Sequence, residues 1–252
     1  MALVTQTQPP ALRRRALQAR PPGASITRLS KLGLLLDAQV VDVGCGDGAF
    51  GLVAAPMPRF VTGVDTSTRA IQTFLTRAAC QGIPARAVLA SAGGLPLASG
   101  VYDLVVSRLT LHQCVDPARA VAEMLRVLRP GGQLVIADLA GYAEPPAEAF
   151  DQSLQILADQ SHQRALPLAA LSVLCSGLGA RILEADIIDE EWVGGLMLGE
   201  WLDQKATPAH RRRDVQTLLD TAPASTLVRL GITAIEGHWC LPIRLTFLRV
   251  AK

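Results

Sequence analysis

Residues 40–50 read Val-Val-Asp-Val-Gly-Cys-Gly-Asp-Gly-Ala-Phe, and this stretch decides the fold. Its apolar start predicts a buried strand that runs into a glycine turn. Without Cβ atoms, such a turn can bend sharply and let a ligand lie against the backbone. A lone carboxylate, Asp65, follows the next apolar run, at 61–64. If both runs are parallel strands, Asp65 ends beside the turn, where a carboxylate can accept both hydroxyls of a ribose. The two features together predict a nucleoside-binding site.

Two kinds of nucleoside cofactor fit these residues. Gly44, Gly46 and Ala49 satisfy the loose dinucleotide fingerprint G-x-G-x-x-G/A, with an acid about 20 residues further on. That fingerprint alone is weakly specific. Asp42 lies two residues before the first glycine, where a dinucleotide-binding strand normally carries an apolar residue. A nicotinamide dinucleotide is therefore the second interpretation of the turn.

Three stretches resemble motifs of the class I S-adenosylmethionine-dependent methyltransferases. Asp-x-Gly-x-Gly-x-Gly at 42–48 resembles their motif I. Leu-Pro-Leu at 95–97 and Tyr-Asp-Leu-Val-Val-Ser at 102–107 resemble their "LPF…FDLV" segment, and 124–134 resembles "RVLKPGGxL". These motifs follow one another in the family's order over residues 38–140. The resemblance implies an α/β, Rossmann-like fold, in which a seven-stranded, mostly parallel sheet with an antiparallel last strand carries helices on both faces and an inserted lid.

Apolar runs alternate with helical patterns along the chain, which predicts right-handed crossovers and a parallel sheet. We expect strands at 39–43, 60–64, 86–90, 102–107, 134–137, 180–187 and within 241–250. We expect helices at 25–36, from the glycine turn to about Ala54, at 67–82, from 116 to the glycines at 131–132, at 167–176 and within 192–220. The resemblance also implies a final antiparallel hairpin of the sixth and seventh strands. We expect residues 1–30 to form an arm or lid, and 31–252 the methyltransferase domain, with a lid insertion at about 141–166.

The resemblance assigns the glycine turn and the acid after the second strand to the cofactor. The glycines would cradle the methionine portion of S-adenosylmethionine, Asp65 would accept the ribose hydroxyls, and Asp42 would organise the methionine end. Each feature also has a structural explanation: a tight turn, a helix N-cap at Asp65, and local backbone N–H groups that satisfy Asp42. The residues implied here are Asp42, Gly44, Cys45, Gly46, Gly48, Asp65 and Thr66.

Residues after the third and fourth strands complete the expected cofactor site. The family's "GDAxxLPF" maps onto 90–97, which puts Ser91 where an aspartate usually meets the adenine amino group. A neutral hydrogen bond contributes about 0.5–1.5 kcal/mol, against about 1.5–3 kcal/mol for a charged acceptor, so we expect somewhat weaker binding. The backbone N–H of Ala92 would meet an adenine ring nitrogen. Ser107 and Arg108 would face the cofactor's amino group through their backbone.

Two histidines are candidate bases. Residues 107–112 resemble the family's "S-x-x-x-L-H" segment and end in His112, and imidazole suits proton abstraction near neutral pH. The alternative role of His112 is to orient its loop. Residues 159–162 resemble the "DPSH" lid segment of some bacterial small-molecule methyltransferases, with Gln160 in place of the proline. His162 would then face the acceptor, or lie solvated in the lid.

Composition bounds the remaining classes of protein. The chain has 252 residues, half of them apolar, and a formal net charge of +2, which argues against nucleic acid or an anionic membrane as partner. Its five cysteines are scattered without a Cys-x-x-Cys pair, which indicates reduced thiols in a cytoplasmic protein and no zinc site. No secretion signal, membrane-spanning run or metal-binding set of carboxylates is expected.

The expected activity is methyl transfer from S-adenosylmethionine to a small-molecule acceptor, either free or carrier-bound, with S-adenosylhomocysteine as product. Residues 38–140 resemble ubiquinone/menaquinone C-methyltransferases and malonyl-carrier-protein O-methyltransferases of bacterial biosynthesis. Two alternatives stay open: methylation of RNA or protein, and a catalytically silent nucleoside-binding protein, to which Ser91 gives some footing. The sequence predicts neither the acceptor nor the oligomeric state.

Overall fold

The computed structural model describes residues 22–32, 37–54 and 57–252. Most of the expected N-terminal arm, residues 1–30, lies outside the described residues. Its last part belongs to α2 (Ala24–Lys31), within the helix predicted at 25–36, of which 33–36 also lie outside. Within the described part of the chain, no helix is both long and apolar enough to cross a bilayer.

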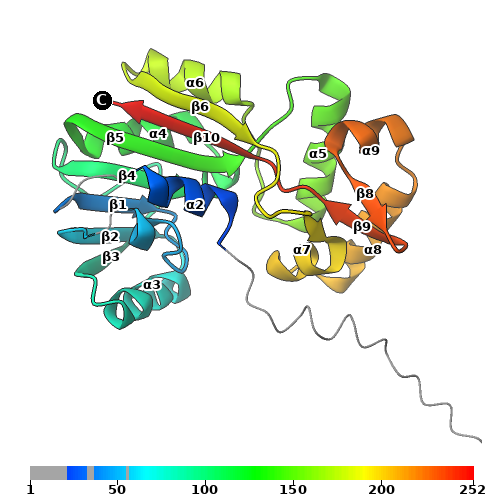
Figure 1. The fold of residues 1–252 in the computed structure, drawn as a ribbon, viewed down its shortest axis with the longest axis horizontal. Helices are drawn as coiled ribbons and strands as arrows, with labels where there is room; N and C mark the ends of the chain where they lie inside the picture. Colours follow the sequence, from blue (N-terminus) through cyan, green and yellow to red (C-terminus); the bar gives the residue numbers. More distant parts are fainter. Residues whose placement is uncertain (1–21, 33–36, 55–56) are drawn as a thin grey trace, which may run out of the picture.

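The core is a seven-stranded sheet that matches the predicted architecture (Figure 1). Side by side lie β3 (Ala85–Leu89), β2 (Phe60–Asp65), β1 (Gln39–Val43), β4 (Tyr102–Arg108), β5 (Leu128–Leu139), β10 (Leu245–Ala251) and β6 (Arg181–Ile188). The first five are parallel to one another, whereas β10 is antiparallel to both β5 and β6. A dinucleotide-binding sheet follows the order 3-2-1-4-5-6, so the inserted antiparallel strand separates this fold from it.

Helices cover both faces because buried residues of the central strands alternate between them. On one face, Val41 and Val43 of β1 join the apolar side of α4 (Pro117–Val127) and of α6 (Leu168–Gly177). On the other face, Val40 packs with α2, with the 3-10 turn η1 (Gly51–Val53) and with α3 (Thr68–Cys80). Asp116 caps α4 with Pro117 at its first turn, and Ser67 caps α3.

The prediction of a helix from the glycine turn to about Ala54 is wrong, because the structure has only a short 3-10 turn there. Gly44, Gly46 and Gly48 all have positive φ, so the turn continues to Gly48 and leaves few residues for a helix. Only η1 forms there. A short segment gains too few hydrogen bonds to offset the cost of nucleating an α-helix.

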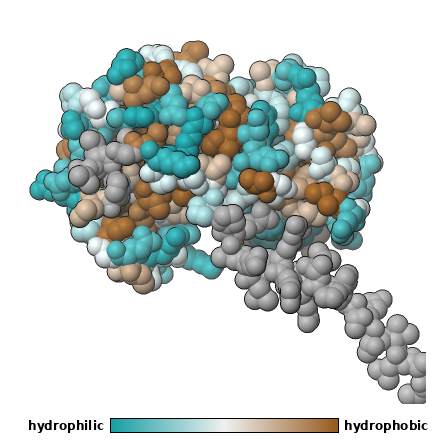
Figure 2. Space-filling view, in the orientation of Figure 1, coloured by the Kyte–Doolittle hydropathy of each residue, from teal (hydrophilic) through white to brown (hydrophobic). Residues whose placement is uncertain are grey.

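A second lobe packs beside the sheet, on the right in Figure 1. It contains α5 (Pro145–Ala158), α7 (Leu198–Gln204), α8 (Ala209–Asp220), α9 (Ala224–Leu230) and a small antiparallel sheet of β7 (Leu196–Met197), β9 (His238–Leu241) and β8 (Thr233–Ile235). One apolar cluster joins these elements to the ends of β5 and β10. Apolar side chains also reach the surface where the lobes meet (Figure 2).

The lobe changes two expectations from the sequence. The sixth and last strands do pair, but residues 189–244 lie between β6 and β10, so they form no hairpin. The helical region 192–220 is two helices, because Ala206 takes a left-handed φ of 51° and Pro208 precedes α8. Within the expected lid at 141–166, α5 contacts α8 and α9. Whether this segment moves as a lid stays a prediction.

Candidate functional site

A pocket of about 1290 Å³, counted out to its open mouth, lies at the carboxyl ends of β1, β2 and β4. Its walls come from the loops that follow these strands and β3. We call it the cofactor-side pocket, and its lining is Gly44, Gly46, Val64, Asp65, Thr66, Ala90, Ser91, Ala92, Gly93, Arg108, Leu109, Thr110, Gln113, Cys114, Val115 and Asp116. The pocket therefore brings together the glycine turn, Asp65, the Ser91–Ala92 segment and the loop after β4, which the sequence analysis had identified one by one. Ligands of open parallel sheets bind at such strand ends.

The glycine turn needs glycine for two different reasons. A Cβ on Gly44 would lie 2.0 Å from Thr110 Oγ1, so the turn and the loop after β4 can approach only because that atom is missing. At Gly46, φ is 50°, and no described atom lies within 4 Å of where a Cβ would stand. The backbone of Gly46 is therefore open to the pocket, where a ligand can lie against it.

Asp65 lines the pocket and is not the helix cap. Its Oδ2 accepts the Gly46 N–H at 3.0 Å, and its Oδ1 accepts the Ser67 N–H at 2.9 Å. Ser67 is the N-cap of α3, with Ala70 N–H donating to its hydroxyl. A carboxylate has about four acceptor positions, so Asp65 can still accept two hydroxyls.

Four of the predicted cofactor residues stand behind the pocket rather than in its wall: Asp42, Cys45, Gly48 and Ser107. Asp42 is buried, and its Oδ2 accepts the Gly51 N–H at 2.9 Å. Burial raises the pKa of Asp42 to about 7, and the negative charge of Asp65 adds to this shift. Burial likewise raises the pKa of the Cys45 thiol. The Ser107 hydroxyl donates to the Val43 carbonyl at 3.0 Å and ties β4 to β1. These residues stabilise the glycine turn and do not line the pocket.

Arg108 connects the pocket to the N-terminal helix. Its Nη2 donates to Glu191 Oε1 at 2.8 Å and its Nε to Ser25 Oγ at 3.0 Å. Glu191 is buried and also accepts the backbone N–H of Ser25. Sequence analysis did not find Ser25 and Glu191, which are 166 positions apart and match no motif. The network clamps the start of α2 beside the wall of the pocket.

The two candidate bases, His112 and His162, lie against each other. Their ring centroids are 5.5 Å apart, both rings are buried, and neither lines the cofactor-side pocket. His112 Nδ1 lies 2.7 Å from Asp138 Oδ1, and the other oxygen of Asp138 accepts the N–H groups of Thr110 and Leu111 at 2.7 Å each. His112 Nε2 and His162 Nδ1 have no hydrogen-bond partner among the described residues.

Burial and neighbouring groups shift the pKa values of Asp138 and His162. Burial alone would raise the pKa of Asp138, but the His112 ring and two backbone N–H groups outweigh it and lower that pKa. Burial, with His112 and Lys205 nearby, lowers the pKa of His162 to about 4, so His162 is neutral at pH 7. A neutral imidazole can accept a proton, but this one reaches no open surface of the pocket.

The lining of the cofactor-side pocket fits an adenosyl compound. Asp65 offers free acceptor positions for a ribose diol, and Gly46 exposes its backbone next to them. Ser91 and Ala92, the residues expected to meet adenine, lie in the same wall. In the part of the chain that the structure describes, no three His, Cys, Asp or Glu side chains gather as metal ligands.

Comparison with known proteins identifies the type of domain. Residues 41–136 match a family model described as "Methyltransferase domain". Those residues are therefore a methyltransferase domain, and the named relatives and structural neighbours of the chain include S-adenosylmethionine-dependent methyltransferases. S-adenosylmethionine is accordingly the cofactor, and of the two interpretations of the glycine turn it is the S-adenosylmethionine one that is confirmed.

Relatives of this methyltransferase support the same family. An uncharacterized methyltransferase of Bacillus subtilis, YcgJ, is 26% identical over 73% of this chain and 72% of its own. A malonyl-[acyl-carrier protein] O-methyltransferase of Enterobacter lignolyticus is 33% identical, over 64% of this chain and 61% of the relative. The chain thus spans less than two thirds of that second relative.

Solved structures share the fold of this methyltransferase. The crystal structure of YcgJ superposes with a TM-score of 0.79 over 90% of this chain and 97% of YcgJ, at 22% identity. Geranyl diphosphate C-methyltransferase from Streptomyces coelicolor, in complex with Mg²⁺, geranyl diphosphate and S-adenosyl-L-homocysteine, gives 0.60 over 90% and 78%, at 14% identity. At these identities the likeness establishes the fold alone.

Proposed function

We propose that this methyltransferase transfers the methyl group of S-adenosylmethionine to a small biosynthetic acceptor, either free or attached to a carrier. The observation that carries the proposal is the cofactor-side pocket, where Asp65 and the Gly46 backbone meet the Ser91–Ala92 wall. Relatives named malonyl-[acyl-carrier protein] O-methyltransferase and ubiquinone biosynthesis O-methyltransferase support a small acceptor, either attached to a carrier or free.

The residues of the pocket would bind and orient. Asp65 would accept the ribose hydroxyls, Ser91 the adenine amino group, and Ala92 N–H would donate to an adenine ring nitrogen. The backbone of Arg108 would face the cofactor's amino group. When bound, S-adenosylmethionine supplies a methyl carbon whose bond to sulfur breaks, with the electron pair staying on sulfur, as the bond to the acceptor forms. Because the donor is already activated, orientation and exclusion of water are the protein's main contributions.

The loop at 108–112 would hold the methyl group of the cofactor and the acceptor in position for transfer. Asp138 fixes it through the N–H groups of Thr110 and Leu111 and through the His112 ring. These contacts favour a positioning role for His112, while proton abstraction from the acceptor by His112 or His162 stays a prediction. An acidic acceptor needs no base, whereas a carbon acceptor would need one.

The activity is tested by incubating purified protein with S-adenosylmethionine labelled in its methyl group and with three separate acceptor fractions. These are low-mass metabolites, purified RNA and purified protein from a bacterial extract. We expect acid-stable label in the low-mass fraction only, and none with Asp65→Ala protein. Label confined to RNA or protein would contradict the small-molecule proposal, and binding without any transfer would indicate a silent cofactor-binding protein.

A further inference from the structure

The adenine end of the cofactor-side pocket lacks the acid that the family motif places there. Ser91 lines the pocket at the position where that motif carries an aspartate, and its hydroxyl makes no hydrogen bond among the described residues. The amino group of adenine has two N–H donors. One neutral hydroxyl can accept one of them, so the other N–H needs an acceptor from elsewhere in the wall.

A second acceptor lines the same pocket. Asp116 precedes α4, and its Oδ1 accepts the backbone N–H of Arg119 at 2.9 Å, which caps the helix. In the part of the chain that the structure describes, its other oxygen, Oδ2, has neither a hydrogen bond nor an ion pair. A carboxylate has about four acceptor positions, so the cap leaves most of them available. Asp116 can therefore accept a donor from a ligand in the pocket.

Ser91 and Asp116 stand at the same end of the pocket. The Ser91 carbonyl accepts the Gly94 N–H at 3.2 Å, which closes a turn around Gly93. A Cβ on Gly93 would lie 3.7 Å from Arg119 Cδ and 3.9 Å from its Nε, so this turn packs against the start of α4. Arg119 is also the residue whose N–H Asp116 accepts. The side chain of Arg119 thus joins the turn at 91–94 to the helix that Asp116 caps.

The charge of Asp116 is not neutralised by any cation among the described residues. The pKa of Glu123 is lowered mainly by its hydrogen bond with Arg126, and the Arg119 charge adds to this shift, so Arg119 acts on Glu123 along α4. Burial raises the pKa of the Cys114 thiol to about 11, and the negative charges of Asp138 and Asp116 add to it. Cys114 lines the pocket, so the Asp116 charge acts on the pocket wall.

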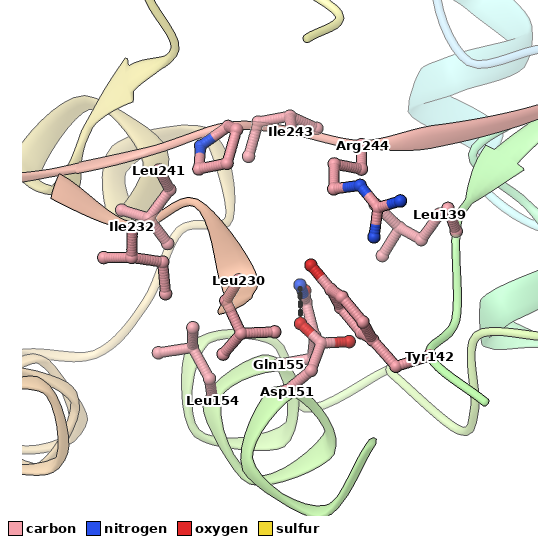
Figure 3. A pocket seen from close by; sticks show the side chains of 12 residues that line it. Leu139, Tyr142, Asp151, Leu154, Gln155, Leu230, Ile232, Leu241, Ile243 and Arg244 are labelled. Carbon is pink, nitrogen blue, oxygen red and sulfur yellow. Dashed lines mark hydrogen bonds between the residues drawn. The ribbon is translucent and has the colours of Figure 1, made fainter. Parts of the chain in front are cut away.

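The hollow between α5 and the segment leading into β10 does not compete for the adenosyl group (Figure 3). None of the glycine turn, Asp65 and residues 91–93 lines it. Its cation, Arg244, already pairs with Asp189 at 3.2 Å, and its Cζ lies 4.9 Å from the centre of the Tyr142 ring. The adenine contacts must therefore come from the cofactor-side pocket.

We propose that Asp116 accepts one N–H of the adenine amino group while Ser91 accepts the other, and that this pair selects adenine over a base with a carbonyl at that position. The acid that position 91 lacks is thus supplied by the loop after β4. This inference rests on the proposed function, and it assigns a further specificity-determining residue to the cofactor-side pocket.

The test compares the binding of S-adenosylhomocysteine and S-inosylhomocysteine by isothermal calorimetry. The second ligand has a carbonyl in place of the amino group and an N–H in place of the neighbouring ring nitrogen. The ratio of the two dissociation constants is the base preference, and the wild type should favour adenine about tenfold or more. Asp116→Asn removes the charge but keeps a residue that caps helices as well as aspartate does. It should weaken S-adenosylhomocysteine binding about three- to tenfold and reduce the base preference, because its amide can donate to the carbonyl.

A rescue variant and a charge control complete the design. Ser91→Asp in the Asp116→Asn background returns the acid to the position of the family motif. It should restore the base preference, and the gain should exceed that of Ser91→Asp alone, because the two positions serve one amino group. The control is Asp47→Asn, which removes an equal charge from the glycine turn, outside the pocket lining. It should leave the base preference unchanged, and thermal unfolding of each variant checks the cap of α4.

An unchanged base preference in Asp116→Asn, or an equal loss of affinity for both ligands, would overturn the assignment of Asp116. The same reduction in Asp47→Asn would mean that net charge, and not contact, sets the preference. Methyl transfer and S-adenosylhomocysteine binding by the wild type are separate readouts. If both succeed while Asp116→Asn keeps its full preference, the proposed function stands and only this inference falls. If the wild type binds neither ligand, both fall.

Discussion

Replacing Asp65 by alanine removes the carboxylate that we assign to the ribose diol. In the structure one oxygen accepts the Gly46 N–H and the other the Ser67 N–H, which leaves an acceptor position on each for a hydroxyl. A hydrogen bond to a charged group contributes about 1.5–3 kcal/mol. Two such bonds amount to about 3–6 kcal/mol, so affinity for S-adenosylhomocysteine should fall roughly 10²- to 10⁴-fold.

Calorimetric titration of the wild type and the Asp65→Ala variant measures this loss. The control is Asp47→Ala, which removes an equal charge from the same turn. Asp47 pairs with Arg77 on α3 and accepts the Ala49 N–H, and it does not line the cofactor-side pocket. Its removal should change affinity only a few fold. Equal losses in both variants would mean that net charge matters and the ribose contact does not; wild-type affinity in Asp65→Ala would refute the assignment.

Three further predictions concern the same site. Burial raises the pKa of Asp42 to about 7, so the folded chain keeps a proton on this carboxyl group that the unfolded chain releases near pH 4. The stabilisation from this group is present below pH 4 and is lost as the pH rises to 7. The free energy of unfolding should fall by an amount on the order of 4 kcal/mol over this range. Asp42→Asn should therefore flatten the pH dependence of urea unfolding between pH 4 and 7, and an unchanged slope would contradict the buried acid. Ser91→Asp should keep or tighten S-adenosylhomocysteine binding, by up to about tenfold for a charged acceptor; abolished binding would mean that adenine lies elsewhere. His112→Ala and His162→Ala should each leave that affinity within a few fold while methyl transfer falls, so a collapse of affinity would place the rings on the cofactor side.

The sequence predicted the sheet and the turn well because their signals are local. The glycines at 44–48 and the acid at 65 were recognised from the residues next to them in the sequence. The bounds of β1, β2 and β4 followed from apolar runs, which are buried in the sheet. The bounds of β5 did not: it begins at Leu128, inside the stretch predicted to be helical as far as 131–132, because α4 ends at Val127. The number of strands and the antiparallel last strand came from the family resemblance, and the structure confirms both.

The second lobe and the clamp around Arg108 escaped prediction because their contacts are distant in sequence. Helices α5, α8 and α9 bury their apolar sides against one another and the strand ends, which no local pattern reveals. Glu191 meets Ser25 and Arg108 only after the chain has crossed the sheet several times. The histidines were recognised one by one, but their contact with each other depends on how the segment after α5 docks onto His112, whose carbonyl accepts the N–H groups of Gln163 and Arg164.

The most direct measurement is a pair of calorimetric titrations of the purified protein, one with S-adenosylhomocysteine and one with NADH, under identical buffer conditions. The glycine turn, Asp65 and the antiparallel β10 predict saturable, one-to-one binding of S-adenosylhomocysteine and no heat of binding for NADH. Binding of NADH, or silence with S-adenosylhomocysteine, would contradict the assignment of this pocket to an adenosyl-sulfur cofactor.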